Sequence, residues 1–137
     1  MLGVLMSASV ASGYALNRTR GQYLATRLSV ADTHWSRFCG LMGKASSEFR
    51  QEQGLWIVPC RGVHTCWMRF PIDVIYLTRD KVVLHLEPAL PPWRFAPVRL
   101  GAASVLELPE NTVRVTGTTI GDQLEIDTRA SGVNDPA

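Results

Sequence analysis

The chain has 137 residues, of which 46% are apolar and 19% are charged, so it has the composition of a folded protein rather than of a disordered one. That length fits a single domain with one hydrophobic core. The net charge of +2 comes mainly from scattered arginines, which excludes the dense basic face that nucleic-acid binding requires.

The first residues of the chain are almost all small or apolar, and the run is too short to span a bilayer as a transmembrane segment. A secretory leader requires a basic residue before its apolar run, and this run has none. Residues 1–17 are therefore interpreted as an atypical leader or a disordered extension. A cytoplasmic location is favoured, and export by an atypical N-terminal signal is the alternative. Residues 18–127 are expected to form one globular β-rich domain, and residues 128–137 a disordered tail.

The first predicted elements of the domain are a strand and a helix. Residues 22–31 alternate between apolar and polar side chains with the period of a half-buried strand. Asp32 or Thr33 can then begin a short amphipathic helix that ends at Gly43. The apolar side chains of this helix recur at helical spacing and are Trp35, Phe38, Cys39 and Met42.

Beyond the helix the chain is strand-like. Strands are predicted over residues 55–58, 63–70, 74–77, 82–86, 105–108 and 123–127. Four prolines make residues 88–103 an extended loop, and residues 112–116 fit either a helical turn or a strand. The sequence therefore predicts a mainly β fold (β-rich α+β), a small barrel-like sheet of about six or seven short strands with one short helix and no crossover helices.

Short motifs follow one another in a fixed order along the predicted domain. They are Gly40-Leu41-Met42-Gly43, Gly54-Leu55-Trp56-Ile57, Pro59-Cys60, His64-Thr65, Met68-Arg69-Phe70-Pro71-Ile72-Asp73-Val74, Val105-Leu106-Glu107-Leu108-Pro109 and Gly121-Asp122. Their combination resembles the bacterial family called domain of unknown function 192. The resemblance implies a small barrel-like β domain with no established biochemical role. The chain departs from the family pattern at Cys66, where an aromatic residue is usual, and at Asn111, where Gly is usual. Asn is the residue after Gly that best tolerates a positive φ.

Cysteine and histidine residues are the first candidates for chemistry. Cys60, His64 and Cys66 are of the types that bind zinc, but their spacing matches no common zinc pattern. A fourth ligand could come from His85 or Asp73 only if the next strand paired in a suitable register, so no cofactor is predicted. The alternative is that Cys66 is a small buried apolar residue and that His64 is hydrogen-bonded in the sheet.

A thiol reaction is the second hypothesis. A histidine beside Cys60 would stabilise the thiolate, so Cys60 and His64 could serve a small thiol- or metal-dependent enzyme. Such an enzyme requires a Cys60 that is alkylated rapidly near neutral pH. In an exported protein a disulfide between Cys60 and Cys66 would compete with that role and leave Cys39 over.

The third hypothesis is a ligand-binding surface. Arg61, Arg69, Trp93 and Arg94 offer planar cations and a flat apolar ring, which suit a small anionic or sugar-like ligand. In the alternative, Trp93 plugs the end of the barrel and the arginines are solvated. A binding or structural-accessory role is favoured over catalysis.

Structural roles are predicted for two aspartates. Asp73 lies in an apolar run, where an unpaired buried carboxylate is costly, so it either faces solvent at the start of the strand or pairs with Arg69 or with backbone N–H groups. We expect Asp73 to fix the turn at Pro71. The pair Gly121-Asp122 is expected to form a tight turn in which the carboxylate accepts backbone hydrogen bonds.

Overall fold

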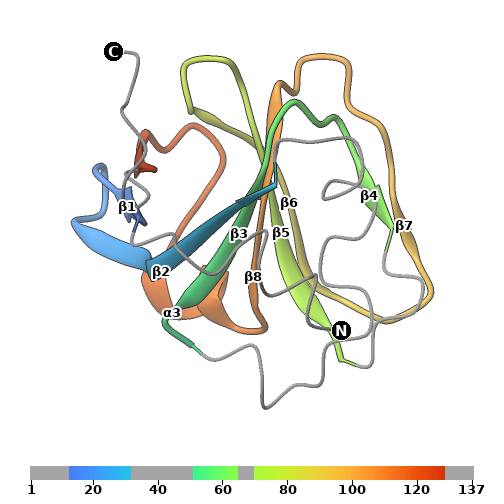
Figure 1. Ribbon diagram of the computed structural model, residues 1–137, viewed down its shortest axis with the longest axis horizontal. Coiled ribbons are helices and arrows are strands. Elements are labelled where there is room, and N and C mark those ends of the chain that lie inside the picture. Colours follow the sequence, from blue (N-terminus) through green and yellow to red (C-terminus); the bar gives the residue numbers. More distant parts are fainter. Residues whose placement is uncertain (1–12, 32–50, 65–69, 129–137) are drawn as a thin grey trace.

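The computed structural model describes residues 13–31, 51–64 and 70–128. They form the strands β1 (Gly13–Asn17), β2 (Gln22–Ala31), β3 (Gln53–Ile57), β4 (Val63–His64), β5 (Ile72–Leu77), β6 (Val83–Leu90), β7 (Phe95–Ala96), β8 (Ser104–Pro109) and β9 (Leu124–Asp127), and one short helix, α3 (Thr112–Thr116). Seven strands make one sheet in the order β6-β5-β8-β3-β2-β1-β9, curled into a half-barrel (Figure 1). The mainly β architecture predicted from the sequence is confirmed.

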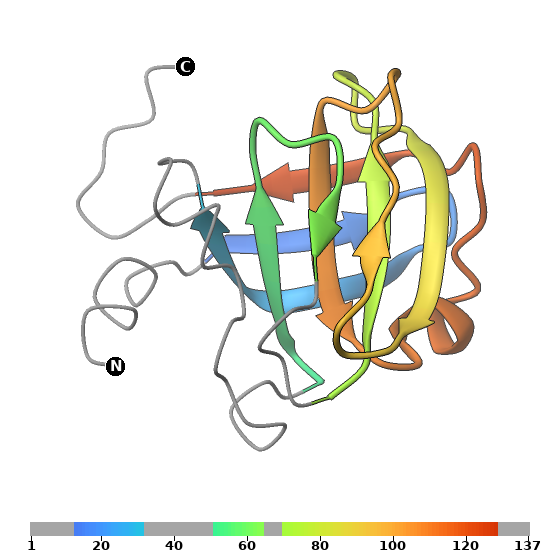
Figure 2. The same cartoon turned by 90° about the vertical axis from the view of Figure 1, so that its right-hand side faces the viewer.

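The curled sheet folds back over itself. Figure 2 shows β3, β8, β5 and β6 side by side, with β1, β2 and β9 crossing behind them. An isolated antiparallel bridge between Val82 and Gln123 joins the start of β6 to the start of β9. The two edge strands of the sheet are thus brought together at one end of the half-barrel.

Alternation along the strands gives the sheet two apolar faces. The inner face is enclosed by the curl, and its buried side chains are Ala15, Leu24, Ala25, Leu28, Ile75, Leu77, Val83, Leu106, Leu108, Val113 and Leu124. The outer face includes the β4–β7 ribbon, which lies in front of β8 and β5 in Figure 2. Its buried side chains are Ala31, Leu55, Ile57, Phe70, Ile72, Val74, Tyr76, Leu90, Ala96, Ala102 and Val105.

Strands β5 and β8 are buried along their whole length, because both of their faces are covered. Each is a central strand, and the two pair antiparallel from Ile72 opposite Pro109 to Leu77 opposite Ser104. A polar side chain on either strand therefore cannot reach water by lying on an open face. This makes Asp73 and Glu107 exceptional residues.

The topology differs from the sequence expectation at one pair of strands. Strands β2 and β3 are parallel, with Arg27 opposite Gln53 and Ala31 opposite Ile57. Parallel neighbours need a crossover connection of a dozen or more residues, and residues 32–52 supply it. Nothing in the sequence indicated this parallel pair, whereas the prediction of no crossover helices concerns residues outside the described part. The helix predicted in that connection lies outside the described residues.

Several element boundaries also differ. Residues 13–17, assigned by sequence to the N-terminal extension, form β1 and pair with both β2 and β9. Residues 88–90 extend β6, and residues 95–96 form β7, within a segment predicted to be all loop. Residues 112–116, which fitted two structures, form α3. Asn111 precedes α3 and has φ 77°, so it adopts the positive φ that an asparagine was expected to tolerate at this position.

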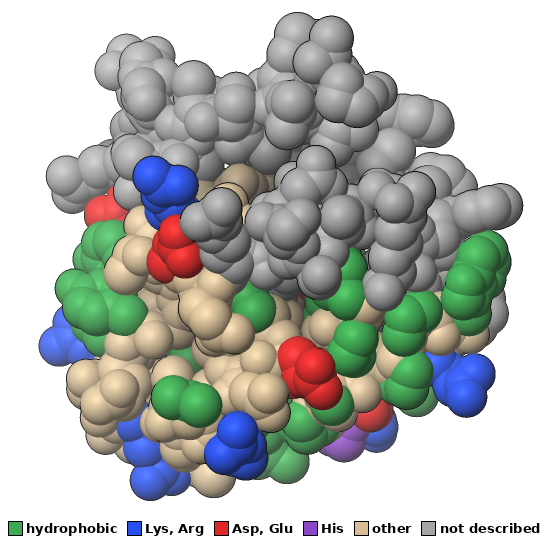
Figure 3. All heavy atoms as spheres, turned by 90° about the horizontal axis from the view of Figure 1, so that it is seen from below, with side chains coloured by type: hydrophobic (Ala, Val, Ile, Leu, Met, Phe, Trp, Pro, Cys, Tyr) green, Lys and Arg blue, Asp and Glu red, His purple; other side chains and the backbone are tan. Residues whose placement is uncertain are grey.

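The described part of the side seen from below in Figure 3 carries no dense patch of charges of one sign. In Figure 3 acidic and basic side chains lie singly among hydrophobic and neutral ones on the described part of this side. Among the described residues, no helix has the length and apolar character needed to cross a membrane.

Candidate functional site

The residues predicted to carry thiol or metal chemistry are described only in part. The Cys60 Sγ donates a hydrogen bond to the Gly62 carbonyl at 2.9 Å, and its backbone N–H donates to Ala103. The side chain of His64, and Cys66 and Cys39 altogether, lie outside the described part. The Cys60–His64 pair therefore stays a prediction. Within the described part, no three His, Cys, Asp or Glu side chains gather closely enough to hold a metal ion.

The residues predicted to bind an anion or a sugar lie at two different places. Strands β4 and β7 pair antiparallel, with Val63 opposite Ala96, so the residue before β4 lies at the opposite end of the ribbon from the residues before β7. Arg61 is accordingly beside Arg99, whose backbone N–H donates to the Arg61 carbonyl. Trp93 and Arg94 are exposed at the other end. Arg69 lies outside the described residues.

Asp73 is held by backbone groups from two elements. Its carboxylate accepts hydrogen bonds from the N–H of Ala89 in β6 and of Val113 in α3, both at 2.8 Å. The side chain is 1% exposed, so these two bonds replace the water that it has lost. Asp73 thus ties the end of β6 and the start of α3 to β5, a link that involves more than the turn at Pro71.

Asp122 is the centre of a second buried network. Its carboxylate accepts hydrogen bonds from Asn17 at 2.9 Å, Arg20 at 3.0 Å and the Thr119 N–H at 3.0 Å. Burial raises the pKa of Asp122, but these hydrogen bonds outweigh the burial and lower the pKa to about 2. Gly121 has φ 96°, which only glycine adopts readily. This network fastens the β1–β2 turn to the turn before β9.

Pairing across three strands places an unexpected set of polar residues on the outer face. Directly opposite residues of neighbouring strands point to the same side. Val74 lies opposite both Glu107 in β8 and Glu87 in β6, and Tyr76 lies opposite His85 in β6. With Arg99 from the loop before β8, these residues form what we call the outer-face polar set, defined as Tyr76, His85, Glu87, Arg99 and Glu107.

Glu107 is the most unusual member of this set. Its side chain is 2% exposed, and no described residue supplies a hydrogen bond to its Oε1. Its neighbours on the adjacent strands, Leu55 and Val74, are apolar. Burial therefore raises the pKa of the Glu107 carboxyl from its ordinary 4.5 to about 8, so the group is mainly protonated at neutral pH.

The other end of the set is in contact with solvent. The side chains of His85, Glu87 and Arg99 are 29%, 27% and 39% exposed. His85 Nε2 lies 2.9 Å from Arg99 Nη2 and 3.0 Å from Glu87 Oε2. One ring nitrogen cannot accept from the guanidinium and donate to the carboxylate at the same time, so the three groups compete for it.

Tyr76 lies between the exposed and the buried parts of the set. Its ring contacts His85 edge-on, and the Arg99 guanidinium lies 5.9 Å from the centre of the ring. The Tyr76 hydroxyl donates to the Pro97 carbonyl at 2.5 Å. Burial, and next the negative charge of Glu87, raise the pKa of Tyr76 to about 12, so the hydroxyl keeps the proton that it donates to the loop carrying Arg99.

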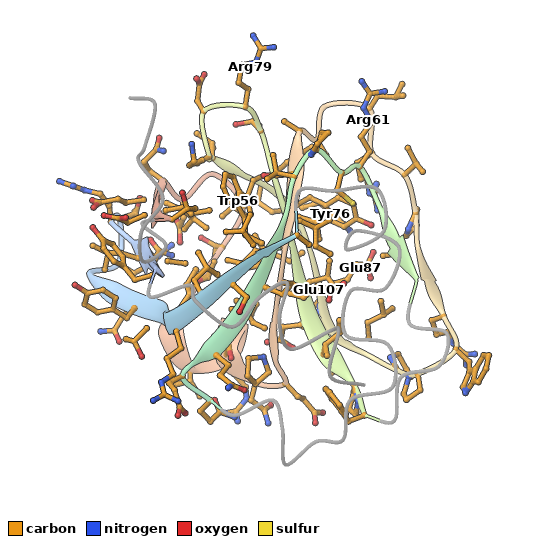
Figure 4. All side chains as sticks on the ribbon, viewed as in Figure 1. Trp56, Arg61, Tyr76, Arg79, Glu87 and Glu107 are labelled. Carbon is orange, nitrogen blue, oxygen red and sulfur yellow. The ribbon has the colours of Figure 1, made fainter. Side chains whose placement is uncertain are left out.

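Figure 4 shows the labelled Tyr76, Glu87 and Glu107 gathered beside one another, while Arg61 and Arg79 project at the upper end of the view. Sequence reasoning missed this set because its members come from three strands and a loop. One local signal was available: His85 lies in the predicted strand 82–86 and Glu87 directly follows it, and residues two apart in a strand share a face. Glu107 gave a weaker signal, as the single charge among four strand residues.

Comparisons with known proteins agree on a family and give no activity. A UPF0127 protein of Thermococcus sibiricus is 30% identical over 128 residues, which cover 88% of this chain and 80% of the relative. A UPF0127 protein of Pyrococcus furiosus is 32% identical over 117 residues, which cover 80% of this chain and 95% of the relative. Both organisms are archaea, so the resemblance noted in the sequence is not limited to bacteria.

Two solved structures share the fold. A protein of unknown function from Novosphingobium aromaticivorans has a TM-score of 0.73 at 21% identity and covers 84% of both chains. A protein from Sinorhizobium meliloti, described only as a candidate transcription regulator, has a TM-score of 0.74 at 20% identity and covers 88% of this chain and 95% of its own. At such identities the likeness concerns the fold alone. The model of the family DUF192, described as "Uncharacterized ACR, COG1430", matches residues 15–126, and the chain belongs to that family.

Proposed function

We propose that this protein is a binding module for a small polar molecule and that the outer-face polar set is its binding site. The observation that carries the proposal is the Glu107 carboxyl, which is buried in the middle of an apolar sheet face with Oε1 unpartnered by the described residues. Perturbed titratable groups of this kind are concentrated at functional sites.

Keeping Glu107 buried lowers the stability of the folded protein. Burying a polar group without a hydrogen bond costs about 1–3 kcal/mol by protein mutational data. A leucine at this position would fill similar volume without that cost, because both strand neighbours are apolar. A bound molecule that completes the hydrogen bonding of the carboxyl offsets the cost, and we infer that Glu107 serves binding rather than stability.

One end of the site is in contact with water, and the end at Glu107 is closed. Neighbouring strands lie about 4.8 Å apart, so Glu107 and Glu87, two strands apart on one face, are separated by about 10 Å between Cα atoms. His85, Glu87 and Arg99 keep partial contact with water. A small molecule can therefore contact the exposed end directly, whereas contact with Glu107 requires the buried side chains beside it to move.

The experiment compares Glu107→Leu with Glu110→Leu, a matched change at an exposed position in the turn after β8. Each protein is heated with and without millimolar glucose, maltose, acetate, inorganic phosphate, methylammonium or benzamidine, and unfolding is followed by fluorescence. We expect at least one compound to raise the Tm of the wild type and of Glu110→Leu, and no compound to raise that of Glu107→Leu. No response in the wild type, or an equal response in Glu107→Leu, would contradict the proposal.

A further inference from the structure

Three loops meet at one end of the half-barrel, which we call the three-loop end. They are the β3–β4, β5–β6 and β7–β8 loops, residues 58–62, 78–82 and 97–103. Backbone hydrogen bonds join them, because the Arg99 N–H donates to the Arg61 carbonyl at 3.0 Å and the Ala103 N–H donates to the Leu77 carbonyl at 2.8 Å. Figures 1 and 2 both place these loops at the upper end of the molecule, so their side chains share one surface.

The β7–β8 loop has its polar and apolar side chains the opposite way round from an ordinary surface loop. Arg99 turns back onto the outer face of the sheet, where Nη2 lies 2.9 Å from His85 Nε2 and Nε is buried without a partner among the described residues. The side chains on either side of it, Val98 and Leu100, are 68% and 85% exposed. Contact with water alone favours the reverse arrangement, because burial benefits an apolar side chain and costs a cation its hydration. The exposed pair therefore indicates a partner that takes up apolar groups.

Positive charge is concentrated at the same end. The three loops carry four basic residues and one acidic residue, which are Arg61, Arg79, Lys81, Arg99 and Asp80. Of the 14 basic and 12 acidic residues of the chain, ten and eleven therefore lie elsewhere, so the three loops account for the whole positive net charge. Arg61 and Arg79 are exposed, form no ion pair with any described residue, and project at the upper end of Figure 4. An anionic surface is attracted to this end of the molecule.

The small size of the apolar area favours a bilayer over a protein partner. A stable protein interface buries about 800 Å² on each partner. Here the apolar area consists of Val98 and Leu100, with the exposed Pro97 and Pro59 beside them. A bilayer requires no complementary shape, because apolar side chains enter among the lipids while cations remain at the anionic headgroups.

We propose that the three-loop end docks on an anionic lipid bilayer. Val98 and Leu100 insert among the lipids, and Arg61 and Arg79 contact the headgroup phosphates. These four residues lie outside the outer-face polar set, so the inference concerns a second surface and does not depend on the proposed binding function.

The test begins with co-sedimentation of the wild-type chain with lipid vesicles. One vesicle type is pure phosphatidylcholine, and the other contains about 30 mol% of the anionic lipid phosphatidylglycerol, each at about 50 mM and about 500 mM NaCl. We expect binding to the anionic vesicles to be at least about tenfold tighter than to the neutral ones at low salt. High salt should remove most of this difference, because it screens charges at the surface.

Two double variants test the residues themselves. Val98→Gln with Leu100→Gln should weaken binding to anionic vesicles by at least about tenfold, because the inserted apolar surface is lost. Arg61→Gln with Arg79→Gln should weaken it by about fivefold for each arginine removed.

Matched controls come from α3, which lies at the opposite end of the molecule in Figure 1. Val115, which is 70% exposed, and Arg114 are changed to glutamine in the same way, and Val115→Gln with Arg114→Gln should leave vesicle binding unchanged. Circular dichroism checks that each variant is folded.

Several outcomes would overturn the inference. One is a wild type that binds neither vesicle at low salt, or that binds both equally, and this result needs no variant. Binding that survives both double changes at the three-loop end would place the contact elsewhere. Self-association in sedimentation velocity that Val98→Gln with Leu100→Gln abolishes, without any vesicle binding, would make this end an interface between two copies of the chain instead.

Discussion

Glu107 should make stability depend on pH in the direction opposite to that of most carboxylates. Replacing Glu107 by glutamine should remove this dependence. In the folded protein the carboxyl has a pKa of about 8, against an ordinary value of 4.5 that the unfolded chain is expected to have. Between these values the unfolded chain releases the proton and the folded protein keeps it. Rising pH therefore favours the unfolded chain, and stability falls as pH increases from 4.5 to 8.

The magnitude follows from the same two values. They differ by about 3.5 pH units, and one unit corresponds to 1.36 kcal/mol, so the full effect is on the order of 5 kcal/mol. Over the range from pH 5 to 7 the expected loss is about 2.5 kcal/mol. Glutamine does not titrate, so Glu107→Gln removes this contribution and should gain stability relative to the wild type as pH rises.

The assay is urea unfolding of the wild type, Glu107→Gln and Glu110→Gln at half-unit steps from pH 5 to 8.5. Other titrating groups contribute equally to all three proteins, so the difference between the curves isolates Glu107. The wild type and Glu110→Gln should lose stability relative to Glu107→Gln by about 1.0 to 1.3 kcal/mol per pH unit from pH 5 to 7.5, and by less at higher pH. Parallel curves for all three proteins would refute the claim that the buried carboxyl holds its proton.

Three further changes test the surrounding structure. Asp73→Ala should lower the free energy of unfolding by about 3 kcal/mol, because two backbone N–H groups lose their acceptor, and an unchanged urea midpoint would contradict this. Asp122 has a lowered pKa, so its stabilising effect is complete above pH 4 and is lost as pH falls toward 2. Asp122→Asn should therefore show a flatter acid-unfolding curve by circular dichroism than the wild type. An identical curve would count against the network. Arg99→Gln should move the proton of neutral His85 toward Nε2, which then donates to Glu87, and unchanged 15N shifts of the ring would show that Arg99 does not set the tautomer.

Most strands other than β1 and β7 were predictable from the sequence, because local pattern specifies them. The alternation in residues 22–31 marks β2, and the apolar run before Pro109 marks β8. The parallel pairing of β2 with β3 was not predictable, since alternation indicates a strand but not its neighbour. Residues 13–17 were misassigned for a related reason: β1 is stabilised by pairing with β9, more than a hundred residues away.

The candidate site could not be predicted for the same reason, because its residues meet only through the pairing of strands. In isolation, Leu106-Glu107-Leu108 looks like a half-buried strand with its charge toward water. Only the covering of both sheet faces turns that position into a buried one. The sequence marked Asp73 as an acid that either faces solvent or needs partners, but it could not identify the partners Ala89 and Val113, because they come from elements whose place depends on the fold.

The pairing of Tyr14 with Asp127 has a consequence for biosynthesis. The sheet lacks its last strand until the C-terminal part of the polypeptide has emerged from the ribosome, so the nascent chain must wait with β1 unpaired on one side. Contacts this distant in sequence also slow the final folding step. During that interval the exposed strand edge is a target for chaperones, and a message truncated before residue 124 would yield a product unable to complete the sheet.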